Sequence, residues 1–427
     1  MISVLGSVWA LLLGTFLIML GNGMQFTLIG LRGDIEGFST GALAIITSGY
    51  YIGFLSGARV TPALIRRVGH VRVFAALGSF MSAGLIALPL ATEVWAWTPL
   101  RLLIGFCMSG VYVAAESWLN HAATNDTRGK ILSAYMIAQT LGVIGAQALL
   151  TLGDAATSAL FIAASILVSL SFGPILLSVS PTPAVTVTRA MSLKELFGHA
   201  PLGTVGTFLL GGIYATQSGM GAVFGTQIGL STPQIALFVA MLFAGALFLQ
   251  YPIGWLSDIM DRRKLIFGAA ALGAAACAFG LMTEGRSDML LLAAFFAGGV
   301  TTPLYSLFLA YTNDDLPPDD MPAASGGLVF VFGIGAIAGP LLCGWAMQMF
   351  GPQGFWVILT GTFAGISAYA LYRMTQRPRV KDQDTDSYLT VLPTTSLVAV
   401  EAATSWAVEQ AEGEQEGDHR ERVQTGL

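Results

Sequence analysis

The chain is poor in charge, cysteine and histidine. Of its 427 residues, 11% are charged and 54% are hydrophobic, and it holds only 3 cysteines and 4 histidines. Soluble domains carry about 25% charged residues, so this composition argues against a soluble domain. The three cysteines lie singly in apolar runs and the histidines are scattered. Neither pattern indicates a disulfide framework or a metal site, and we expect no metal and no cofactor.

Several functional motifs are also missing. No Gly-Lys-Ser/Thr loop that could cradle a phosphate occurs, which argues against an ATP-driven pump. The apolar runs show no grouped nucleophile and base, so we do not expect an enzyme. The net charge of −5 lies in the tail, because residues 1–375 hold 15 acidic and 15 basic residues whereas 376–427 hold 10 and 5. The apolar part therefore shows no basic surface for nucleic acid.

Long apolar runs fill most of the chain. A bilayer core is spanned by about 20 apolar residues in a helix, and twelve runs reach that length. We therefore predict an all-α membrane protein with twelve transmembrane helices. The first run has no Lys or Arg before it and exceeds a signal-peptide core, so we expect it to remain as a helix. The predicted helices are 4–30, 41–65, 72–92, 96–120, 131–152, 157–179, 202–226, 233–256, 265–283, 287–311, 323–349 and 353–374.

Basic residues in the loops predict the orientation. The loops after the even-numbered predicted helices hold ten Lys or Arg residues, whereas those after the odd-numbered helices hold Arg32 and Arg286. Cytoplasmic loops carry the excess of positive charge. We therefore expect a cytoplasmic (inner) membrane protein with both termini in the cytoplasm.

The apolar part also divides into two similar halves. An offset of 192–193 residues pairs Gln25 with Gln217, Tyr112 with Tyr305, and Gly142 with Gly335. Two repeated six-helix bundles, with a substrate between them near mid-membrane, are an architecture of transporters. We predict an N-terminal bundle (1–179), a cytoplasmic linker (180–200), a C-terminal bundle (201–375) and an acidic, mostly disordered tail (376–427).

One charged stretch, GWLSDIMDRRK at 254–264, resembles the loop motif of the major facilitator superfamily, Gly-x-x-x-Asp-Arg-x-Gly-Arg-Arg. Gly254, Asp258, Arg262 and Arg263 match it, whereas Ile259 and Asp261 depart from it. The first-half copy at 62–72 keeps Arg67 and Gly69 but has Arg66 where the family has Asp.

A second match lies in the fourth predicted helix. Arg101 and Gly105 resemble the family's Arg-x-x-x-Gly pattern, and Glu116 with Arg128 resembles its Glu…Arg-Gly element. The resemblance covers about residues 4–375 and is nearest to the YcaD-type bacterial subgroup. It implies a secondary transporter that moves a small molecule by alternating access in the lipid bilayer, coupled to an ion such as the proton.

The resemblance also implies a charged gate at the cytoplasmic end. Its candidate residues are Arg66, Arg67, Gly69, Glu116, Arg128, Gly254, Asp258, Arg262 and Arg263. We expect Arg262 and Arg263 to reach carboxylates or carbonyls across the interface between the halves, although a plain topology signal remains an alternative. The acidic loop residues Asp314, Asp315, Asp319 and Asp320 can pair with the loop arginines, bind cations or simply be solvated, and their spacing argues against a metal site. Glu116 can pair with Arg128 or Arg66, or carry protons.

Polar residues within the helices are candidates for the substrate cavity. They are Asn22, Gln25, Arg101, Gln139, Tyr214 and Gln217. Polar groups in a dry setting need partners, which either a water-filled cavity or a neighbouring helix supplies. For Arg101 the alternatives are an anionic substrate group, a proton step, or snorkelling to the surface.

The tail leaves a second function open. A membrane sensor or scaffold that does not transport could signal through residues 376–427, with a short helix at 397–410 that docks weakly on a partner or on the membrane surface. A solvating tail is the plainer alternative.

Overall fold

The computed structural model describes residues 2–123, 125–177, 191–283, 287–314, 316–317, 320–376, 391–396, 399–400 and 403. Twelve long helices and one short helix make up nearly all of this part, and no strand occurs in it. The helices are α1 (Ile2–Ile35), α2 (Thr40–Val68), α3 (His70–Ala87), α4 (Val94–Ala122), α5 (Asn125–Leu150), α6 (Ala159–Leu177), α7 (Leu193–His199), α8 (Pro201–Gln227), α9 (Thr232–Ile259), α10 (Arg262–Leu281), α11 (Ser287–Asn313), α12 (Met321–Phe350) and α13 (Gly354–Gln376).

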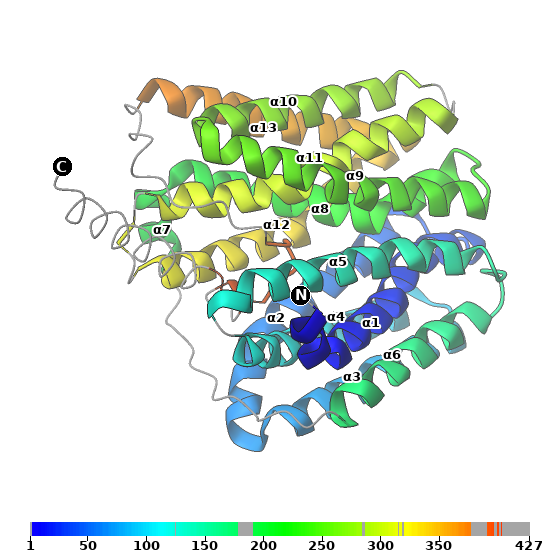
Figure 1. Cartoon of the computed structure of the whole chain (residues 1–427). Coiled ribbons are helices and arrows are strands. Elements are labelled where there is room, and N and C mark those ends of the chain that lie inside the picture. Colours follow the sequence, from blue (N-terminus) through cyan, green and yellow to red (C-terminus); the bar gives the residue numbers. More distant parts are fainter. Residues whose placement is uncertain are drawn as a thin grey trace.

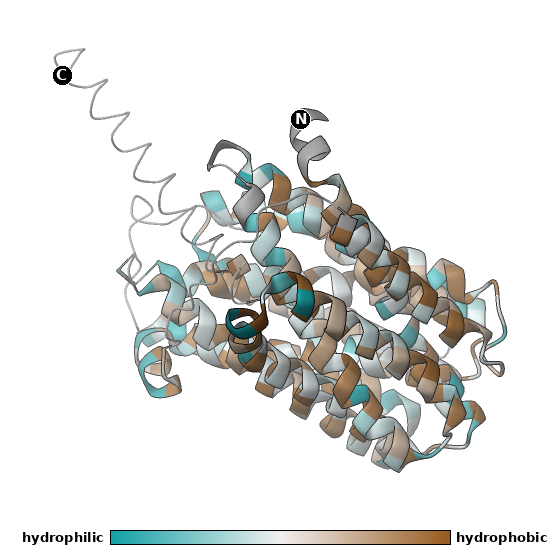
Figure 2. Cartoon of the chain, turned by 90° about the horizontal axis from the view of Figure 1, so that it is seen from below, coloured by the Kyte–Doolittle hydropathy of each residue, from teal (hydrophilic) through white to brown (hydrophobic). Residues whose placement is uncertain are grey.

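The surface of the bundle is that of a membrane protein. Apolar residues run along the length of the helices, and hydrophilic residues gather toward the ends of the bundle (Figure 2). Trp255 and Tyr251 near one end, and Trp95 and Trp345 near the other, are exposed, as in the aromatic belts at membrane interfaces. In the described residues, nine helical stretches are long and apolar enough to span a membrane, or ten if the bent pair α7 and α8 counts as one. One of the nine joins α12 to α13, and α6 is a shorter apolar helix.

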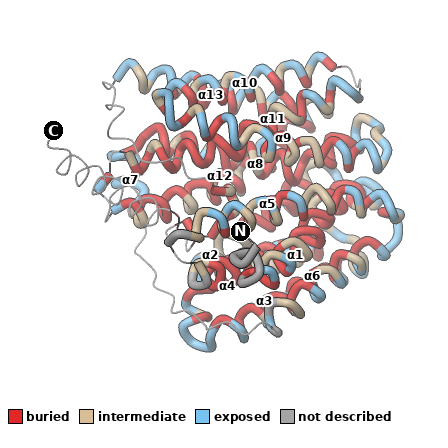
Figure 3. Tube along the Cα trace, in the orientation of Figure 1, coloured by how far each residue is buried: buried red, intermediate tan, exposed pale blue. Residues whose placement is uncertain are grey.

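The helices form two halves, α1–α6 and α8–α13, that pack in the same way (Figure 1). In the first half α2 packs on α4 and α1 on α5, and in the second half α9 packs on α11 and α8 on α12. Helices α3, α6, α10 and α13 lie at the two outer edges, and the most buried segments lie between them (Figure 3). The predicted fold class, with two repeated six-helix bundles, is confirmed.

Glycines mark the closest helix crossings at equivalent places in the two halves. A Cβ at Gly53 would lie 1.9 Å from the Leu102 carbonyl oxygen, and one at Gly245 would lie 1.9 Å from the Phe295 carbonyl oxygen. These pairs join α2 to α4 and α9 to α11, and they are related by the predicted offset. Small residues let backbones approach closely where lipid supplies no hydrophobic drive between helices.

The predicted linker holds a short helix. Ser192 caps α7 in a capping box with Glu195. The Met191 backbone N–H donates to the Ala323 carbonyl of α12 at 2.8 Å, and Leu196 is fully buried. The described end of this linker is therefore fixed to the C-terminal half. Residues 178–190 lie outside the described part.

A short segment of the tail packs inside the bundle. Residues 391–396, expected to be mostly disordered, lie between the two halves, and Val391, Thr395 and Ser396 are buried. Ala399, Val400 and Ala403 are also buried, whereas most of the short helix expected at 397–410 lies outside the described residues. An acidic composition over the whole tail concealed an apolar and hydroxyl-bearing stretch that a cavity between helices can accept.

Candidate functional site

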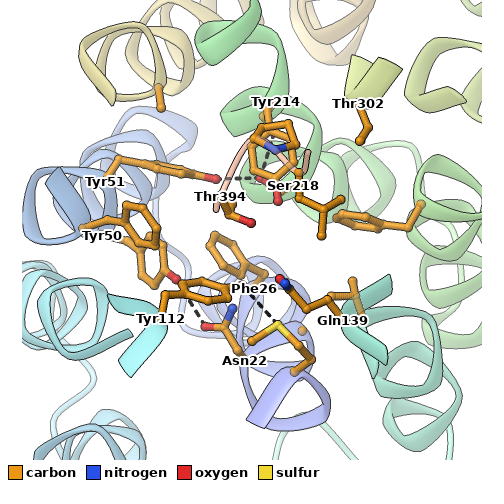
Figure 4. A pocket seen from close by; sticks show the side chains of 18 of the residues that line it. Asn22, Phe26, Tyr50, Tyr51, Tyr112, Gln139, Tyr214, Ser218, Thr302 and Thr394 are labelled. Atoms are coloured by element: carbon orange, nitrogen blue, oxygen red, sulfur yellow. Dashed lines mark hydrogen bonds between the residues drawn. The ribbon is translucent and has the colours of Figure 1, made fainter. Parts of the chain in front are cut away.

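A cavity of about 80 Å³ lies between the halves. Helices α1, α2, α4 and α5 line it from the first half, and α8, α9, α11 and α12 from the second, together with Leu392, Pro393 and Thr394 of the tail (Figure 4). Most of the lining is apolar or aromatic, and none of the described lining residues is charged. Such a wall suits an uncharged ligand held by a few hydrogen bonds.

A buried polar network stands behind the cavity wall on α1 and α4. The Arg101 guanidinium donates to the Gln25 side-chain oxygen, and the Gln25 amide donates to Asn22 at 2.9 Å. The guanidinium also lies 4.7 Å from the Phe26 ring centre and 4.6 Å from that of Tyr50. Arg101 is fully buried, which excludes snorkelling in this structure. Of these network residues, Asn22, Phe26 and Tyr50 line the cavity, whereas Gln25 and Arg101 do not.

The other predicted cavity residues separate into two groups. Gln139 lines the cavity, and its buried amide nitrogen has no hydrogen-bond partner in the described residues. Tyr214 also lines it. Gln217, in contrast, is tied to α11, because its amide donates to the Ala297 carbonyl at 3.1 Å and its oxygen accepts from Thr301 at 3.0 Å. It faces a smaller neighbouring pocket.

Sequence reasoning missed most of the aromatic lining. Tyr51 on α2 and Ser218 on α8 share a hydrogen bond of 2.7 Å that joins the two halves (Figure 4). Tyr50 and Tyr112 line the first-half side of the cavity. The adjacent tyrosines at 50 and 51, within an apolar run, were the available signal, since a buried phenol needs a polar partner.

The halves contact each other directly at the end of the bundle that carries the α1–α2 loop. The Gln227 amide donates to the Thr40 hydroxyl at 2.6 Å. Backbones also approach closely there: a Cβ at Gly219 would lie 2.2 Å from the Thr47 methyl group, and one at Gly344 would lie 2.5 Å from the Ala44 Cβ. This end of the cavity is therefore closed by α1, α2, α8 and α12.

Glu116 has different partners from those expected. Its carboxylate accepts from the Tyr135 hydroxyl at 2.8 Å and from the Ser396 backbone N–H at 2.7 Å. In the described residues its carboxylate makes no ion pair with Arg66 or Arg128; Arg66 is exposed and Arg128 half-buried. The inserted tail supplies a donor where we expected an arginine.

The remaining gate candidates lie at the turns between helices. Gly69 ends α2 with a φ of 86°, which glycine adopts without strain, and Arg67 beside it is exposed. Gly254 is buried in α9, and Asp258, four residues on, is exposed. The two loop copies therefore lie in equivalent places, between α2 and α3 and between α9 and α10.

The arginines of the second loop bind within their own half. Arg262 forms a buried ion pair with Asp314 at the end of α11, as expected for Asp314, and its Nε donates to Ser257 at 3.2 Å. Arg263 pairs with Asp261 at 3.0 Å. We expected both arginines to reach across the interface. The Arg262–Asp314 pair ties α10 to the end of α11 within the C-terminal half, whereas Arg263 pairs with the residue that caps α10.

Comparisons with known proteins agree with this architecture. A family model described as Major Facilitator Superfamily matches residues 11–232 and 202–406. The chain is 26% identical over 352 residues to the uncharacterized MFS-type transporter YfkF of Bacillus subtilis, covering 81% of this chain and 90% of YfkF. It is 26% identical over 364 residues to the uncharacterized MFS-type transporter YcaD of Escherichia fergusonii, covering 82% and 92% of the two chains.

Two solved structures share the fold at 14% sequence identity. The nucleoside transporter NupG superposes with a TM-score of 0.69, covering 87% of this chain and 100% of NupG. A bacterial homologue of the human lysosomal transporter Spinster, in an inward-facing and occupied conformation, gives a TM-score of 0.65 and covers 95% and 96%. The family match spans most of the chain and the twelve-helix fold supports it, so the chain belongs to the major facilitator superfamily of membrane transporters.

Proposed function

We propose that the chain is a secondary active transporter that moves a small molecule through the central cavity by alternating access. The observation that carries this proposal is a cavity built from both halves and closed at one end by direct contacts between them. Rocking of one half against the other would open that end and close the other around a fixed site. The excess of basic residues in the loops at the other end of the bundle supports a cytoplasmic position for that end and for both termini, in a bacterial inner membrane.

The lining favours an uncharged, amphipathic substrate. Aromatic rings from Phe26, Tyr50 and Tyr112 offer flat apolar surface, and Asn22 and Gln139 offer hydrogen bonds. Bringing a charged group into such a wall would cost several kcal/mol unless a partner met it. Arg101 is close, but the Phe26 and Tyr50 rings lie against its guanidinium.

Glu116 is our candidate for proton coupling. It is a buried carboxylate held by two neutral donors, the Tyr135 hydroxyl and the Ser396 backbone N–H. Buried carboxylates without a cationic partner are typical of proton relays in transporters. A proton taken up here would neutralise the carboxylate as the halves rearrange.

The test is a thermal-shift screen of the purified protein in detergent, with uncharged amphiphiles and charged metabolites at two pH values. A ligand of the folded state raises the midpoint. We expect the hits to be uncharged. Their shift should be lost in Gln139→Ala and kept in the matched variant Gln217→Ala, because the Gln217 side chain faces another pocket. Hits should then be transported by proteoliposomes under a pH gradient. Ligands that bind but are never transported would refute the proposal.

The tail between the halves favours one second candidate, a sensor that does not transport. A ligand that fills the cavity would displace residues 391–396, and the released tail would then reach a partner. Binding without transport, together with a tail-dependent partner, would select this alternative.

A further inference from the structure

The tail segment 391–396, which we name the tail plug, enters the central cavity as a folded-back turn. The Thr395 backbone N–H donates to the Leu392 carbonyl at 3.0 Å, which makes the turn compact. Leu392, Pro393 and Thr394 at its tip line the cavity. Thr394 lies among the labelled cavity residues, near Ser218 (Figure 4). The tail plug therefore occupies space that a substrate would need.

The contacts of the tail plug are specific hydrogen bonds to both halves. On α11 the Ser306 hydroxyl donates to the Val391 carbonyl at 3.1 Å and accepts from the Val391 backbone N–H at 3.0 Å. On α4 the Glu116 carboxylate accepts from the Ser396 N–H. At the tip, Thr394 lies in the cavity lining together with Tyr112 and Tyr214, which come from opposite halves (Figure 4).

We infer that the tail plug is an intramolecular inhibitor that competes with substrate for the cavity and holds the two halves in this one arrangement. This inference rests on the proposed function for its substrate, but the docking and release of the tail plug do not depend on transport. A plug that bonds to both halves must leave before they can rock. It also satisfies Glu116, so an inhibited transporter would have its proton site covered.

Competition has a quantitative consequence. A binding site that is free for only a fraction of the time shows an apparent affinity lowered by that fraction. If the tail plug fills the cavity for about 90–99% of the time, its release should raise the apparent affinity for any cavity ligand by about 10- to 100-fold.

The release variant is Val391→Asp in the full-length chain. Val391 is 4% exposed, and a carboxylate there would be buried without a partner. The substitution changes only the tail, so the helices keep their sequence. Gln376→Asp is the matched control, because it adds the same charge at an exposed position at the end of α13.

The measurement is the labelling rate of Thr395→Cys with a hydrophilic maleimide in detergent. Thr395 is buried, and the native cysteines Cys107, Cys277 and Cys343 are buried as well. We expect slow labelling in Thr395→Cys alone, which is the parent, and in Gln376→Asp. Labelling should be at least tenfold faster with Val391→Asp, in a protein that still melts cooperatively well above the labelling temperature. A ligand from the screen should accelerate labelling of the parent.

Two results would overturn the inference. Labelling as fast in the parent as in the unfolded protein would show that the segment does not dock. If Val391→Asp, or the parent at saturating ligand, were labelled as slowly as the parent alone, the segment would be a permanent part of the fold and not a releasable inhibitor. The transport proposal has its own readout, proteoliposome uptake, so failure of the inference and failure of the transport proposal give different results.

Discussion

The glycines at the closest helix crossings allow a prediction with a worked magnitude. A Cβ added at Gly53 or at Gly245 would lie 1.9 Å from a backbone carbonyl oxygen, whereas ordinary contact begins at 3.4 Å. The helices must therefore part by about 1.5 Å (3.4 minus 1.9) to accept alanine. Overpacking costs typically 1–3 kcal/mol, and the upper end applies because a backbone oxygen cannot rotate aside.

We expect Gly53→Ala and Gly245→Ala each to lower the stability by about 3 kcal/mol. The assay is thermal unfolding of the purified protein in detergent, followed by loss of helical signal. Because the two sites lie in different halves, the double variant should lose about the sum.

Gly361→Ala is the matched control, because no atom lies within 4 Å of a Cβ at that helical position. It should leave the midpoint unchanged or raise it slightly. If Gly53→Ala melted with the control, the close crossing of α2 and α4 would be refuted. If only one of the two variants were destabilised, the structural equivalence of the two crossings would be refuted.

Three further predictions concern the charged residues. Arg262→Ala and Asp314→Ala should each destabilise the protein by about 3 kcal/mol, because the ion pair between two buried charges is broken. The double variant should cost much less than the sum of the two. Additive losses in a double-mutant cycle would refute the ion pair. Glu116→Gln keeps an acceptor for Tyr135 but cannot carry a proton, so substrate exchange should persist while uptake driven by a pH gradient disappears; uptake at the parent's rate would refute the proton role. Asp258→Asn should cut transport while the protein still reaches the membrane, and a transport rate equal to the parent's would remove Asp258 from the gate.

Much of the fold could be predicted because each membrane-spanning helix needs a long apolar run, which is visible in the sequence. Each predicted run corresponds to a long helix in the structure, and the predicted ends fall short where helices continue into polar residues, as α1 does to Ile35. The offset that pairs the halves could be read from Gly142 and Gly335. In the structure these glycines meet equivalent partners on α1 and α8.

The site was only partly predictable, because the sequence shows which residues are polar but not which way they face. Gln25 and Gln217 occupy equivalent positions, yet one binds Arg101 and the other binds α11, and neither lines the central cavity. The tail plug could not be foreseen from composition, since its six residues are diluted in an acidic tail. Only the long-range hydrogen bonds of Ser306 and Glu116 reveal it.

The direct contacts at the closed end have a mechanical consequence. At Gly219 the nearest group is the Thr47 side chain, and at Gly344 it is the Ala44 methyl group, so only small side chains meet the glycines there. Two such surfaces can separate and meet again without any change of side-chain rotamer. Interdigitated leucines, in contrast, would have to change rotamers to come apart. The resistance to opening of the closed end should therefore come from the few hydrogen bonds across it, such as that between Gln227 and Thr40.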